Sequence, residues 1–211
     1  MALPIQAIVG GNAASSAGSA PVNMRYGATG EIVVQELHGR YYETTARKAM
    51  FSGSNLAGVT TSAGFATTLT GFCLTNPIGS TVNLVVNKVT YAELVAQTAA
   101  VLLGIQTGYS ASTAVTQTTP LVPLSNFVGQ PAGVGLIASA VTIPVAPTRV
   151  ILLGSLTTSA ITTQIGGGNV IDMEGSLVIP PGGYAAFYTS AASVASSLAF
   201  GMQWEEVSIT L

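Results

Sequence analysis

Three sets of side chains in this 211-residue chain have chemistry that could serve catalysis: Asp172 with Glu174, Glu205 with Glu206, and the single histidine, His38. On a strand, Asp172 and Glu174 project from one face, as the two carboxyl groups that flank a glycosidic bond must. Adjacent residues such as Glu205 and Glu206 project from opposite faces and cannot share a substrate. A two-residue spacing is also typical of a solvated strand edge, and we interpret Asp172 and Glu174 in that way.

The other components of an active site are missing from the sequence. A cupin-type metal centre needs several histidines and a carboxylate, whereas the chain has His38 only. No serine lies in a G-x-S-x-G motif, and GGGN at 166–169 lacks the Lys and Ser or Thr of a phosphate-binding loop. Cys73 is alone, which excludes an intrachain disulfide and a cysteine-based zinc site, and we expect it to be buried. The sequence therefore predicts no enzymatic activity and no cofactor.

The elements that would position these residues are predicted to be strands. In LAFGMQW (residues 198–204) the large side chains alternate with small or polar ones, which is typical of a half-buried strand. The PPGG sequence at 180–183 predicts a chain reversal, and hence a hairpin followed by a third strand. Residues 184–189 carry apolar side chains on both faces, which indicates a strand between two packed layers.

The middle of the chain repeats this organisation without a strict period. The apolar phase shifts near Asn87 and Lys88, which predicts a β-bulge. Residues 91–103 are interpreted as strand, connector and strand rather than as a helix. About eight to ten strands favour an all-β sandwich, and we expect a jelly roll. Residues 25–211 would form this domain, and residues 1–24, rich in Gly, Ala and Ser, an extended N-terminal arm.

Charged residues are unusually scarce, at 7% against about 25% in ordinary soluble domains. A free monomer with so few charges would tend to associate, so we expect most of the surface to consist of small neutral residues or to be covered by neighbouring subunits. The net charge of −2 argues against a nucleic-acid partner. No stretch of 18 residues is free of polar and turn-forming residues, which argues against a membrane partner.

Half of the charged residues lie between positions 25 and 48. This segment is predicted to contain an edge strand at 31–37, a turn at 38–39 and a second strand at 47–51. Its polar side chains would form either a solvated face with structural ion pairs or a docking face that orients a partner. The candidate docking residues are Arg25, Glu31, Glu36, His38, Arg40, Glu43, Arg47 and Lys48.

Several stretches together resemble a group of small structural proteins of tailed bacteriophages: GEIVVQELHGRYYE (30–43), TGFCLTNPIGSTVNLVVNKV (70–89), LLGIQTGYSASTAVTQTTPL (102–121), EGSLVIPPGGYAAFYTS (174–190) and WEEV (204–207). The resemblance implies a virion component, a jelly-roll cement or decoration protein on the capsid surface. It also implies a homotrimer or dimer that binds the major capsid protein. It implies no active site, and it does not extend to the N-terminal arm.

Two functions therefore remain open. The first is a non-enzymatic cement or decoration protein that stabilises the phage head. The second is a receptor-binding or glycan-binding module of a phage tail, neck or head fibre, for which Tyr41, Tyr42 and Tyr109 are the candidate aromatic platforms.

Overall fold

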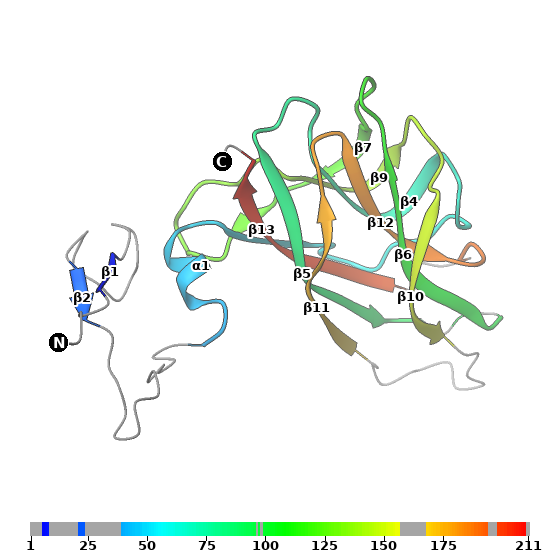
Figure 1. Ribbon diagram of the computed structural model, residues 1–211. Helices are drawn as coiled ribbons and strands as arrows, with labels where there is room; N and C mark the ends of the chain where they lie inside the picture. The colour runs from blue at the N-terminus through cyan, green and yellow to red at the C-terminus, as the bar shows by residue number, and fades with distance from the viewer. Residues whose placement is uncertain are drawn as a thin grey trace.

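The computed structural model describes residues 6–8, 21–23, 39–95, 97, 99–156, 168–193 and 198–209. Eleven of its strands form two antiparallel sheets that face each other as a β-sandwich (Figure 1). The six-stranded sheet has the order β10 (Arg149–Leu156), β6 (Val101–Tyr109), β12 (Gly183–Thr189), β4 (Thr68–Thr75), β9 (Leu136–Thr142) and β7 (Thr116–Leu121). The five-stranded sheet has the order β11 (Gly168–Ile179), β5 (Val82–Glu93), β13 (Leu198–Ser208), β3 (Met50–Ser54) and β8 (Leu124–Ser125).

The strand pairs are nested. β3 pairs with β13, β4 with β12, β5 with β11 and β6 with β10, all antiparallel. Successive pairs belong to opposite sheets. The β5–β13 ladder joins two of the pairs within the five-stranded sheet, and the β6–β12 ladder joins the other two within the six-stranded sheet. Strands β7 to β9 are an insertion between β6 and β10 that extends both sheets.

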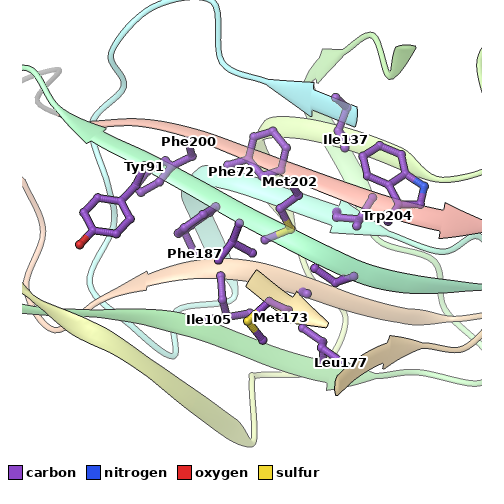
Figure 2. Close-up of a cluster of buried hydrophobic side chains, with 14 of the residues drawn as sticks. Phe72, Tyr91, Ile105, Ile137, Met173, Leu177, Phe187, Phe200, Met202 and Trp204 are labelled. Atoms are coloured by element: carbon purple, nitrogen blue, oxygen red, sulfur yellow. The ribbon is translucent and has the colours of Figure 1, made fainter. Parts of the chain in front are cut away.

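The space between the sheets is filled by large apolar side chains from both layers (Figure 2). Phe187 of β12 stacks on Phe200 of β13 with ring centroids 4.1 Å apart, which joins one sheet to the other. Trp204 is fully buried and stacks against Phe51 of β3. Burial of this aromatic surface is the main favourable contribution to the stability of the sandwich.

The sequence correctly predicted four features of the strands: the buried face of β13, the burial of Cys73, the two apolar faces of β12 and the bulge in β5. The large side chains of β13 point into the core, and Cys73 is completely buried. β12 lies between two apolar clusters, because Ala185 and Phe187 face the inter-sheet core while Tyr184 and Ala186 face a second cluster on the outer side. The bulge also occurs at the predicted place: Gln203 is opposite Lys88 and Trp204 is opposite Val86, so Asn87 has no partner in β13.

The predicted hairpin at the PPGG turn is wrong. The chain does reverse between β11 and β12, but the two strands belong to opposite sheets. The reason is that the turn is hydrogen-bonded to other elements: Gly182 N–H donates to Asn76 O at 2.9 Å, and Ser110 N–H donates to Gly182 O at 3.1 Å. These bonds hold β12 beside β4 and β6 instead of beside β11.

The strand predicted at 47–51 is also partly wrong. Residues Tyr42–Ala46 form a short helix, α1, and β3 begins only at Met50. Lys48 ends the helical turn with a left-handed φ of 62°, while Lys48 N–H and Ala49 N–H donate to the carbonyls of Thr45 and Thr44. The edge strand predicted at 31–37 and the turn residue His38 lie outside the described residues. Within the predicted arm, β1 (Gln6–Ile8) and β2 (Pro21–Asn23) pair with each other.

Candidate docking face

The polar segment that precedes β3 is attached to the outer edge of the five-stranded sheet by a charged cluster. The Arg40 guanidinium Nη1 lies 2.9 Å from a Glu174 carboxylate oxygen and 3.4 Å from Asp172. The Tyr41 hydroxyl donates to Asp172 Oδ1 at 3.1 Å. The Lys88 ammonium lies 4.9 Å from the centre of the Tyr41 ring. The two carboxylates singled out from the sequence are therefore ion-pair partners of a predicted docking residue.

A wide bulge in β11 positions these carboxylates. Four residues, 173–176, lie opposite the single residue Asn87 of β5. The extra length is accommodated by left-handed backbone at Glu174 (φ 49°) and Gly175 (φ 75°), and Glu174 N–H donates to Asp172 Oδ1 at 3.0 Å. The strand alternation from which we expected Asp172 and Glu174 to share a face is interrupted here. They come together because the bulge folds back.

The electrostatics of the cluster favour the charged form of Asp172. Partial desolvation raises the pKa of Asp172, but the hydrogen bonds from Glu174 N–H and Tyr41, with Arg40 and Lys88 nearby, outweigh it and hold that pKa below its ordinary value. A glycosidase general acid needs the opposite shift. The cluster thus has the chemistry of a latch that fixes residues 39–41 to the sheet.

The remaining docking candidates are divided between described and undescribed parts of the chain. Glu43 lies in α1, and Arg47 and Lys48 lie at its C-terminal end. The Lys48 ammonium lies 5.8 Å from the centre of the Phe127 ring. Arg25, Glu31, Glu36 and His38 lie outside the described residues.

A feature that the sequence did not predict is a row of three hollows across the outer face of the five-stranded sheet. The α1 hollow, about 370 Å³, lies between α1 and residues 126–128. The central hollow, about 340 Å³, lies over β3, β13 and β5, and the β11 hollow, about 400 Å³, lies between β3 and β11. The α1 hollow and the central hollow share Asn126, and the central hollow and the β11 hollow share Ser54 and Thr90. We call α1 and these three hollows together the docking face.

The hollows of the docking face carry little charge and are bordered by exposed apolar side chains. Among the described residues that line its hollows, Lys88 is the only charged one. Leu56 is 96% exposed and Val128 92% exposed, and Val122 and Leu124 are exposed beside them. Contiguous exposed apolar surface of this kind marks interaction sites in soluble proteins.

Comparison of the chain with family models, with curated proteins and with solved structures finds no match. In the described ranges no helix is long and apolar enough to cross a bilayer. Nor does the described part of the chain bring three or more His, Cys, Asp or Glu side chains together where they could hold a metal ion. The docking face is therefore the feature of the described structure that bears most directly on function.

Proposed function

We propose that the protein is a non-enzymatic virion component, a capsid cement or decoration protein that binds the major capsid protein and copies of itself at the phage head surface. The docking face is the observation that carries this proposal. It is a hollowed and nearly uncharged surface with an apolar border. At one end of it lie the charged residues Glu43, in α1, and Arg47 and Lys48, at the C-terminal end of α1. The neutral part suits burial against another subunit, and the charged part suits orientation of a partner.

We also infer that the sandwich is a jelly roll. The nesting of β3–β13, β4–β12, β5–β11 and β6–β10 supports this inference, because a double strand rolled into two sheets is the jelly-roll arrangement. Viral capsid domains are among the proteins built in this way. The fold alone does not determine the function, since lectins and metal-binding cupins share it.

A cement protein with such a face needs only modest affinity at each contact. Many copies on one shell act together, and neighbouring contacts raise the effective concentration of each subunit at its site. Few charges would then oppose close approach of sister subunits, which accounts for a charged fraction of 7%. A trimer is the assembly we expect.

The test is binding of the purified protein to phage heads that lack it. A double variant, Leu56→Asp with Leu124→Asp, introduces two carboxylates at the border of the docking face and should reduce occupancy of the heads at least tenfold. Leu152→Asp is the matched control, because Leu152 is 61% exposed on β10 in the other sheet. Co-sedimentation measures the occupancy. Equal binding of the double variant and the wild type would contradict the proposal.

A second candidate function is a receptor-binding or glycan-binding module on a tail, neck or head fibre. It is favoured by Tyr109, which is 55% exposed beside Arg149 in a cleft of the described structure. Of the other two aromatic candidates, Tyr41 is engaged in the charged cluster and Tyr42 lines the α1 hollow. Copy number distinguishes the two functions: hundreds of copies per particle on a stained gel support a shell protein, and a few copies support a fibre or neck protein.

A further inference from the structure

A cleft of about 240 Å³ opens between the two sheets, at the edge where β6 and β10 face β11. One wall is formed by the end of β6 and the start of β10, and the other by residues 177–180. Within this second wall, the apolar side chains of Leu177 and Ile179 are buried. Tyr109, Thr107 and Arg149 line the opposite wall. The cleft is separate from the docking face, because its lining residues occur in none of the three hollows.

The register of the sheet places these three side chains on one face. Thr107 and Tyr109 are two residues apart on β6, so they project to the same side. Arg149 of β10 is the direct partner of Thr107. Ile105, the next residue in this alternation, is completely buried in the inter-sheet core. This face of β6 is therefore apolar inside the sandwich, at Ile105, and becomes polar at the mouth of the cleft, at Thr107 and Tyr109.

Arg149 is the charged residue of this cleft, and within the described residues its side chain has no carboxylate at ion-pair distance and no hydrogen-bond partner. The other described cations differ: Arg40 is paired with two carboxylates, and Lys48 and Lys88 each lie over an aromatic ring. Arg47 is close enough to Glu205 to lower the pKa of that carboxyl group, although burial raises that pKa more strongly. In a chain with so few charges, an unpaired guanidinium beside an exposed tyrosine ring is the feature that suggests a ligand.

We propose that this cleft binds one carboxylate-bearing sugar ring, a uronic acid residue of a polysaccharide. The guanidinium offers a planar pair of N–H donors that matches a carboxylate. The Tyr109 ring provides a flat apolar surface for the C–H face of a pyranose, and the Thr107 hydroxyl can donate to or accept from a sugar hydroxyl. The volume is below the 300 Å³ or more of sites for drug-sized ligands, which fits a single ring.

The experiment titrates the full chain with four probes, observed by NMR. Methyl glucuronide should bind saturably at millimolar concentration. Methyl glucoside, which lacks the carboxylate, and acetate, which lacks the ring, should bind at least tenfold more weakly. An oligosaccharide with a terminal glucuronate should bind at least as tightly as methyl glucuronide, as expected for recognition of a polymer through one ring.

Substitutions at two positions locate the site. Arg149→Met and Tyr109→Ala should each weaken binding of methyl glucuronide about tenfold, and Arg149→Lys should fall between Arg149→Met and the wild type. Arg47→Met and Tyr42→Ala are matched controls on the docking face and should leave binding unchanged. Since Arg149 and Tyr109 are exposed, their variants should keep the wild-type melting temperature, which circular dichroism checks.

Absence of saturable binding of the glucuronides, equal binding of methyl glucoside, or binding unaffected by Arg149→Met would each overturn the proposal. None of these results would affect the capsid proposal, because the cleft and the docking face share no residue.

Discussion

Two adjacent glutamates on β13 show how differently the same residue type is used. Glu206 accepts hydrogen bonds from Gly135 N–H at 2.8 Å and Val134 N–H at 3.0 Å, and Trp204 Nε1 lies 3.4 Å from it. Its carboxylate thus holds the segment before β9 against the edge of the core. Glu205 projects to the other face, beneath the segment that carries α1, where burial raises its pKa although Arg47 offsets part of the shift.

Glu206→Gln should lower the free energy of unfolding by about 1–2 kcal/mol, because hydrogen bonds to a charged acceptor are lost or weakened. Urea denaturation at pH 7 measures the change. An unchanged midpoint would show that residues 134–135 are held by other contacts.

Glu205→Gln should change the free energy of unfolding in the opposite direction. A carboxyl group with a raised pKa in the folded state binds its proton more tightly there than in the unfolded chain, so its contribution to stability decreases as pH rises above about 4. The amide should therefore increase the free energy of unfolding at pH 7 by less than about 1 kcal/mol, since the site is partly exposed. At pH 3, where both forms are neutral, we expect no difference. A gain that persists at pH 3 would contradict this explanation.

For individual residues, the sequence predicted which side chains are buried better than it predicted which side chains form ion pairs. The core position of Trp204 follows from local alternation, and that of Cys73 follows from its residue type. The ion pair between Arg40 and Asp172 joins residues 132 positions apart, and it depends on a bulge whose left-handed backbone is adopted by a glutamate. No local pattern signals such a contact, so both residues were singled out but not connected.

The element that most clearly departs from the sequence prediction is the turn between β11 and β12. Proline and glycine specify a reversal, but they do not specify the sheet that the next strand joins. That choice is made by hydrogen bonds to Asn76 and Ser110, which lie far away in the sequence. β5 and β13 could be predicted because each buries one alternating face, and β12 because it buries apolar side chains on both faces. The strands with which they pair could not be predicted.

Two glycines with nearly the same backbone angle provide a test of this turn. Gly182 has φ 81° and Gly79 has φ 80°, but a Cβ on Gly182 would lie 2.3 Å from Ser110 O, whereas a Cβ on Gly79 would meet nothing within 4 Å. Gly79→Ala should cost about 1–2 kcal/mol for the left-handed conformation alone. Gly182→Ala should cost at least about 2 kcal/mol more, because a backbone hydrogen bond must also shift. Thermal and urea unfolding compare them, and equal costs would rule out the close approach.

The latch at Arg40 gives a second prediction at the level of elements. Arg40→Met should speed hydrogen exchange of the amides of residues 45–49 by up to about fivefold, because exposed ion pairs contribute little to stability. The exchange of core strands should not change. Arg149→Met is the control, since Arg149 has no ion-pair partner among the described residues. Equal exchange in the two variants would show that α1 is held without the latch.

The whole molecule presents two unlike surfaces. The docking face is hollowed and carries little charge, while the cleft at the sheet edge carries a guanidinium that has no ion-pair partner among the described residues. Composition predicted the neutral surface, because charge is scarce throughout the chain, but it could not show which sheet would present it. That depends on the position of α1, which lies beside one end of the five-stranded sheet (Figure 1).

The nested strand order also has a consequence for biosynthesis. Phe51 of β3 is the register partner of Trp204 of β13, so the two positions are 204 − 51 = 153 residues apart. At about 5–20 residues per second, a ribosome needs roughly 8–30 s to add that stretch. During this interval β3 can meet β8 and β4 can meet β9, but β13 is not yet available to β3 and β5. A chain that ends before residue 198 leaves the apolar faces of β3 and β5 without this partner, so we expect it to aggregate rather than to fold as a smaller domain.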